Sequence, residues 1–186
     1  MNMCGDIDEE ITIPELVKEG SLCPHQDYVY FNYPTTAETK EIQNFEERSS
    51  QMLQSLMQDS QLLTVIETHK GLNGQISDDL LLDDPEYLEA ILIYLHSKHT
   101  AFPARLQRLL GTKKLPAMGA KWMERLLQGF LYDDSDSYLC DKVYREMLID
   151  QLKSQGLIEK KKVILTKSAA VEKLLTNSLG KANSIR

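Results

Sequence analysis

The cysteine and histidine side chains are the residues of this chain best suited by type to catalysis or metal binding. Cys23 and His25 flank Pro24, and a thiol beside an imidazole is a pairing that activates a nucleophile. A catalytic cysteine and histidine normally meet through the fold, not as near neighbours in sequence, and a proline holds the preceding residue in extended backbone. We therefore interpret this stretch as a strand entering the fold and not as a reactive site.

Two further groups of residues could bind a metal ion. His96 and His99 lie about one helical turn apart, but the carboxylate or thiolate ligands that would complete a site are not close in sequence. The acidic pairs at 78–79, 83–84 and 133–134 each lie at an expected helix boundary, where carboxylates suit helix N-termini and exposed turns. Phosphate-binding loops, dinucleotide-binding fingerprints, zinc-protease motifs and nucleophile elbows are missing from the sequence. We predict no catalytic, cofactor-binding or metal-binding residue in this chain.

Basic residues are the remaining candidates for binding. The net charge of −7 divides into −14 for residues 1–100 and +7 for residues 101–186. The basic half could attract phosphate, or the two halves could be solvated faces of opposite sign. The candidate contacts to a nucleic-acid backbone are Arg105, Arg108, Lys113, Lys114, Lys121, Arg125, Lys160, Lys161, Lys162 and Lys167.

The elements that would position these residues are mostly helices. Residues 1–34 hold one extended segment, Asp27–Tyr33, which is rich in aromatic and β-branched residues and predicts a strand. From Thr35 the apolar residues take a helical period, beginning with a capping box. Asp84 caps a later helix with Pro85 at its first position, and residues 72–79 are expected to form a loop. We predict a mostly α fold, a multi-helix bundle with an N-terminal strand segment and a small C-terminal β element.

Two positions in the C-terminal half carry specific structural predictions. Gly129 lies within an apolar helix, where glycine costs about 1 kcal/mol relative to alanine, so we expect another helix to pack closely there. The next helix is expected to turn one set of apolar residues inward, namely Leu139, Val143, Met147, Leu148 and Leu152.

The end of the chain shows a helix, a glycine stop and a lysine-rich turn between apolar residues. This pattern over residues 139–178 is similar to the recognition helix and wing of a winged helix, in which lysines contact phosphates without reading the base sequence. The alternative is a small hairpin that closes the bundle with its lysines in solvent. Asp141, Glu146 and Asp150 in the helix weaken a base-reading role.

A further feature is the N-terminal segment "MCGDIDEEITIPELVKEGSLCPHQDYVYFNYPTTAETKEI", which contains Leu22, Pro24, Gln26, Asp27, Tyr30 and Phe31. These residues carry its resemblance to a segment of bacterial superfamily 2 DEAD/DEAH-type helicases. "WMERLLQGFLYDD" and the final "GKANSIR" are similar to parts of the same region. The resemblance implies that residues 1–34 leave a missing ATPase lobe, that 35–180 form a helical insertion domain, and that 181–186 begin a missing second lobe. The Walker A lysine, the magnesium-binding acidic motif and the arginine fingers of that family have no matching position here.

The resemblance implies an accessory insertion domain of an ATP-dependent nucleic-acid helicase that does not hydrolyse ATP by itself. ATP and magnesium would bind in the parent enzyme. The expected partners are a DNA or RNA backbone, RecA-like ATPase lobes in cis or trans, and a second copy of the chain through an exposed Asp27–Tyr33 strand. The alternatives are a protein-interaction domain whose acidic half docks on a basic partner, and a stand-alone winged-helix regulator.

The sequence also predicts the environment of the chain. No apolar run approaches the roughly 18 residues that span a bilayer, so we expect no membrane partner. The start of the chain lacks the pattern of a signal peptide. The three cysteines, Cys4, Cys23 and Cys140, are odd in number and far apart, which is typical of free thiols in a reducing compartment. A cytoplasmic location is therefore expected.

Overall fold

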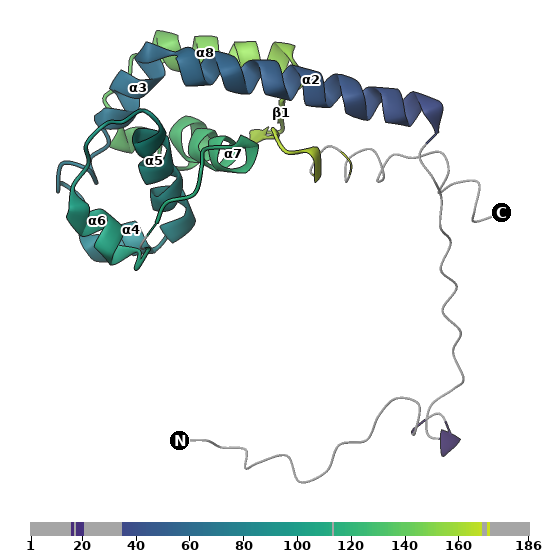
Figure 1. Ribbon diagram of the computed structural model, residues 1–186, viewed down its shortest axis with the longest axis horizontal. Helices are drawn as coiled ribbons and strands as arrows, with labels where there is room; N and C mark the ends of the chain where they lie inside the picture. Colours follow the sequence, from purple (N-terminus) through teal and green to yellow (C-terminus); the bar gives the residue numbers. More distant parts are fainter. Residues whose placement is uncertain (1–15, 17, 21–34, 113, 169–170, 172–186) are drawn as a thin grey trace.

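The computed structural model describes residues 16, 18–20, 35–112, 114–168 and 171 (Figure 1). These residues are mostly helical, with a small two-stranded antiparallel sheet near the C-terminal end, as predicted. The expected strand Asp27–Tyr33 and the segment 181–186 lie outside the described residues. Within the described residues, no helix is both long and apolar enough to cross a membrane.

A long helix and its shorter continuation run along one side of the fold. Helix α2 (Thr36–Gln58) begins with the predicted capping box, in which the Glu38 amide donates to Thr35 Oγ1 at 3.2 Å and the Thr35 amide donates to Glu38 Oε2 at 2.7 Å. Asp59 ends α2 and also caps α3 (Ser60–Glu67), because its carboxylate accepts from two amides of the new first turn. The first turns of α2 extend past the rest of the fold in Figure 1.

Helix α5 (Pro85–Ser97) forms the centre of the core. Asp84 caps it and Pro85 occupies its first turn, as predicted. Nearly every residue from Tyr87 to Leu95 is buried, and a helix that is apolar on all sides must be surrounded by other elements. The short helix α4 (Asp78–Leu82), capped by Ser77, precedes it. The prediction of a loop over 72–79 was therefore wrong at its end, because Ser77 supplies a local cap that starts a helical turn.

Helix α7 (Ala120–Gln128) packs along α5 and continues into a π-helical turn at Gly129–Asp133. A Cβ atom added at Gly129 would lie only 2.0 Å from Cε2 of Tyr87 on α5. The predicted close packing at Gly129 is therefore confirmed. Helix α6 (Ala104–Leu109) lies apart from strand β1, at the lower left of the described helices in Figure 1.

Helix α8 (Lys142–Ser154) and a hairpin complete the described fold. Strands β1 (Ile158–Glu159) and β2 (Lys162–Val163) pair antiparallel, with Ile158 opposite Val163 and Glu159 opposite Lys162. On α8, Tyr144, Leu148 and Leu152 are buried. The prediction that Leu139, Val143 and Met147 also point inward was wrong, because their exposed fractions are 76%, 69% and 53%.

Candidate functional site

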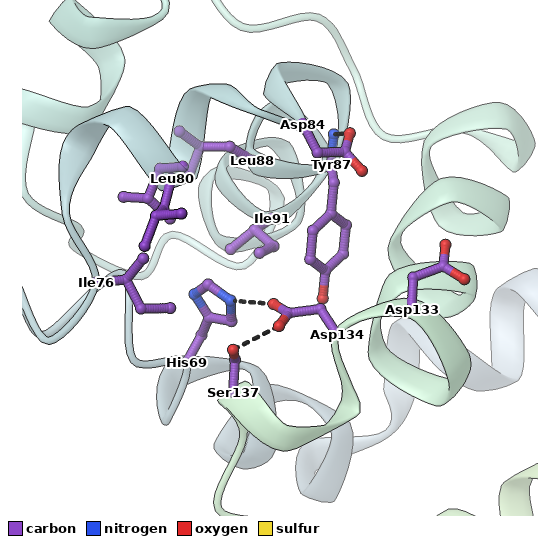
Figure 2. Close-up of a pocket in the computed structure, with 11 residues that line it drawn as sticks. His69, Ile76, Leu80, Asp84, Tyr87, Leu88, Ile91, Asp133, Asp134 and Ser137 are labelled. Carbon is purple, nitrogen blue, oxygen red and sulfur yellow. Dashed lines mark hydrogen bonds and ion pairs between the residues drawn. The ribbon is translucent and has the colours of Figure 1, made fainter.

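A cluster of polar groups in one of the described pockets surrounds His69. The pocket holds about 380 Å³ and combines an apolar wall, which includes Ile76, Leu88 and Ile91, with polar residues from two loops. Figure 2 shows His69 and Ser137 pointing toward the carboxylate of Asp134. The His69 Nε2 atom lies 2.8 Å from Asp134 Oδ2, and the Ser137 hydroxyl donates to the other carboxylate oxygen.

The hydrogen bonds of His69 assign its tautomer. Its Nδ1 atom accepts the Gly71 amide proton at 3.2 Å, so the ring proton must be on Nε2, where it is donated to Asp134. Burial lowers the pKa of His69, although its hydrogen bond and ion pair with Asp134 oppose this shift. His69 is therefore a neutral imidazole with both nitrogens engaged.

This cluster does not have the arrangement of a nucleophile and its base. Ser137 and His69 both bind the Asp134 carboxylate, and no hydrogen bond joins the serine hydroxyl to the imidazole. A serine nucleophile needs such a contact. The neighbouring tyrosines, Tyr87 and Tyr138, hydrogen-bond each other through their hydroxyls, and burial raises the pKa of both. The cluster ties the loop after α3 to the turn after α7 and stabilises their packing.

The Cys23–His25 pair and the acidic pairs are other candidates for catalysis or metal binding that the sequence offered. Cys23 and His25 lie outside the described residues. Among the residues described, no group of three or more histidine, cysteine, aspartate or glutamate side chains could hold a metal ion. Two of the acidic pairs instead bind Arg125, through Asp84 and through Asp133 at 3.4 Å.

The structure divides the ten basic candidates by their partners. Four of them form ion pairs with carboxylates of this chain: Arg105 with Asp78, Lys121 with Glu86 at 2.9 Å, Arg125 with Asp84 and Asp133, and Lys167 with Glu46 at 2.7 Å. Lys113 lies outside the described residues. Arg108 on α6 and Lys114 in the following loop are exposed. Helix α6 lies apart from the hairpin in Figure 1, so the described candidates do not form one surface.

The lysine hairpin, which we define as Lys160–Lys162, places three of the basic candidates next to one another. All three residues are exposed, and within the part of the chain that the structure describes none of their ammonium groups forms an ion pair. Lys160 and Lys161 occupy the two-residue loop with φ angles of 46° and 66°. A two-residue hairpin with positive φ at both positions is usually built from Asn-Gly or similar pairs.

Side chains of α7 anchor this hairpin. Gln128 accepts the Val163 amide at 3.0 Å and donates to the Lys161 carbonyl at 3.3 Å. One carboxylate oxygen of Glu124 accepts the amides of Leu165 and Thr166 at 2.7 and 2.9 Å. The backbone of the lysine hairpin is therefore fixed to the core, while its ammonium groups remain in solvent.

A cleft of about 510 Å³ lies between α7 and the hairpin. Three of the predicted cations, Lys121, Arg125 and Lys162, line it together with Glu86 and Glu124. Lys121 is paired with Glu86, and Arg125 is paired with Asp84 and Asp133, which do not line the cleft. Lys162 forms no ion pair with a carboxylate in the described part of the chain, so its charge is not offset there.

Two features of the structure were not predicted from the sequence. The His69 cluster joins residues that are 65 positions apart, and an isolated histidine gives no local signal for such a contact. The exposed side of α8 did have a signal, because the helix carries apolar residues on more than one face.

Comparison with protein-family models, with curated proteins and with solved structures found no match to this chain.

Proposed function

We propose that this chain is a helical accessory domain of an ATP-dependent nucleic-acid helicase, and that it contacts the nucleic-acid backbone through the lysine hairpin Lys160–Lys162. ATP hydrolysis, with its magnesium ion, belongs to RecA-like lobes in cis or in trans. The helicase context follows from the resemblance of residues 4–35 and 119–134. The observation that carries the contact is the exposed position of three adjacent lysines that form no ion pair with any residue the structure describes.

The backbone conformation of the lysine hairpin supports this proposal. A non-glycine residue in the left-handed region costs roughly 1–2 kcal/mol, and this loop has two of them in succession, both lysine. Such strain is found most often where function requires it. Two lysines presented on a short, anchored loop can reach adjacent phosphates without losing much backbone freedom.

The neighbouring helix does not favour reading of bases. On α8, the exposed side carries Glu146 and Asp150 beside apolar residues. These carboxylates would repel the phosphates that flank a DNA groove. The contact that we propose is therefore independent of base sequence, as phosphate contacts are.

The test replaces the loop lysines while keeping the turn. The double substitution Lys160→Asn and Lys161→Gly removes two charges and introduces the pair that this turn type prefers. The matched control, Lys40→Asn with Lys153→Asn, removes two exposed lysines from helices α2 and α8. Binding of the full chain to labelled single- and double-stranded DNA and RNA is measured across a salt series.

We expect the loop substitution to weaken binding and to reduce the slope of log K against log salt by about 1.8 for duplex DNA, since each phosphate contact contributes about 0.9. The control should keep the wild-type slope. The proposed contact is wrong if the loop variant and the control lose affinity equally, or if the wild-type chain does not bind at low salt. Stimulation of ATP hydrolysis by separately purified RecA-like lobes tests the helicase context, and failure there leaves the nucleic-acid result standing.

A further inference from the structure

We infer that an exposed apolar stripe, formed by Val143 and Met147 of α8 and by Leu139 shortly before the helix begins, is a docking surface for a basic amphipathic helix of a partner protein. These residues are spaced four apart and are 76%, 69% and 53% exposed. They include three of the five large apolar side chains that are exposed in the described part of the chain. The surface shares no residue with the lysine hairpin, so this inference is independent of the proposed nucleic-acid contact.

The stripe is a second apolar face of a helix whose first face is already buried. Successive residues of a helix are rotated by about 100°, so Val143 and Leu148 point roughly 140° apart. Tyr144, Leu148 and Leu152 fill the core side, and Tyr144 is held there by its hydroxyl, which donates to Asp59 at 2.6 Å. The helix therefore cannot rotate to bury the stripe without exposing its core face.

The stripe continues onto a neighbouring groove. The Leu139 amide donates to Thr68 Oγ1 at 3.0 Å, which holds the start of the stripe against the end of α3. A groove of about 430 Å³ lies there, with Leu139, Glu67 and Lys70 among its lining residues. An amphipathic helix that packs along α8 can place one of its apolar anchors in this groove, as in other helix-in-groove interfaces.

The charges beside the stripe specify the partner. By helical geometry, Asp150 points within roughly 20° and Glu146 within roughly 60° of Val143, whereas the lysines of α8, Lys142 and Lys153, point roughly 80–100° away. Glu146 and Asp150 are exposed and form no ion pair among the described residues. Glu67 adds a third carboxylate in the groove, where Lys70 also lies and donates to the Asp136 carbonyl at 2.8 Å. The carboxylates outnumber this cation and favour lysine or arginine beside the apolar anchors of the partner.

A second copy of the chain is a poorer occupant. A two-fold interface places the same surface on both sides, so the carboxylates of Glu67, Glu146 and Asp150 would be duplicated across it. Like charges that face each other across an interface oppose association. A basic helix supplies the opposite charge and covers the same apolar side chains.

The test uses two fluorescein-labelled peptide probes of roughly five helical turns. Both probes carry leucines at i, i+3, i+4 and i+7 spacing; one has lysines beside the leucines, and the other has glutamates at the same positions. The full chain is compared with Val143→Asn/Met147→Gln, which removes apolar surface without changing charge, and with Glu146→Gln/Asp150→Asn. The matched control is Leu80→Gln, which alters a side chain of α4 that is 63% exposed.

We expect the wild-type chain and Leu80→Gln to bind the lysine probe with equal affinity and to bind the glutamate probe at least about tenfold more weakly. Each of the two α8 double variants should weaken binding of the lysine probe by at least about tenfold. The inference is overturned if the lysine probe does not bind, if Val143→Asn/Met147→Gln leaves its affinity unchanged, or if both probes bind equally. Light scattering that shows a dimer dispersed by Val143→Asn/Met147→Gln would also overturn it, because a second copy would then occupy the stripe.

Discussion

The substitution Gly129→Ala tests the closest packing in the core. The backbone of Gly129 is right-handed helical, with φ −62° and ψ −52°, so alanine is compatible with the conformation and would gain about 1 kcal/mol of helix propensity. The obstacle is the ring of Tyr87, whose Cε2, Cζ and Cδ2 atoms lie 2.0, 2.3 and 2.5 Å from the new Cβ position.

Tyr87 has little room to move away from this methyl group. Its side chain is 6% exposed, its hydroxyl is hydrogen-bonded to that of Tyr138, and the Arg125 guanidinium lies 5.1 Å from its ring centroid. Overpacking of a buried site costs about 1–3 kcal/mol, occasionally more, and this exceeds the gain in propensity. Because the new methyl group would overlap the ring so closely, we take the upper part of this range, about 2–3 kcal/mol. The net destabilisation is then about 1–2 kcal/mol, which corresponds to a fall in Tm of about 2–8 °C for a chain of this size.

The measurement is a double-mutant cycle by urea unfolding, with Tyr87→Leu as the second substitution. Leucine lacks the two ring atoms nearest to the new methyl group, so Gly129→Ala should cost less in the Tyr87→Leu background and could there become stabilising through helix propensity. A coupling free energy close to zero would refute the steric explanation. A higher free energy of unfolding for Gly129→Ala than for the wild-type chain would also refute it.

Two further predictions concern the His69 cluster and the base of the hairpin. Because the pKa of His69 is lowered in the folded state, the unfolded chain binds a proton more readily than the folded chain. The free energy of unfolding should therefore fall as the pH drops below about 6.5 toward the folded pKa. Urea unfolding between about pH 5.5 and 8 should show a smaller pH dependence in His69→Gln than in the wild type. Glu124→Ala leaves the amides of Leu165 and Thr166 without their acceptor and should cost about 1–3 kcal/mol, with faster hydrogen exchange at these two amides. Glu47→Ala on the exposed side of α2 serves as the control for the second prediction, and a pH profile unchanged by His69→Gln would contradict the first.

The local signals of the sequence predicted local structure well. The capping box at Thr35 and Glu38, the Asp84–Pro85 start of α5 and the hairpin around the lysines all appear in the structure. Each of these features depends on residues within a few positions of one another, because a cap or a turn is completed by backbone groups of the same short segment. The close packing at Gly129 was also predictable, since a glycine inside an apolar helix loses stability unless a neighbour uses the space.

The candidate sites depended on contacts between distant segments. Arg125 is paired with Asp84, 41 residues earlier, and His69 with Asp134, 65 residues later. The charge count assigns Arg125 to the basic C-terminal half of the sequence. That count cannot show that Asp84, in the acidic half, forms an ion pair with Arg125. For this reason the charge asymmetry overstated the basic surface: among the described candidates, Arg108, Lys114 and the lysine hairpin are the ones that are exposed without an ion pair.

The sequence of α8 by itself determined that the helix has two apolar faces, because the positions of its leucines, valine and methionine follow from the helical period alone. Only the tertiary structure decided which face is buried. That choice depends on where α2, α3 and the hairpin lie, and on anchors such as the hydrogen bond from Tyr144 to Asp59. Burial of an apolar face is a property of the surrounding elements and not of the helix, and this is why Val143 and Met147 were expected in the core but lie on the surface. Leu139 was expected there too, but it precedes the first residue of α8 and is exposed.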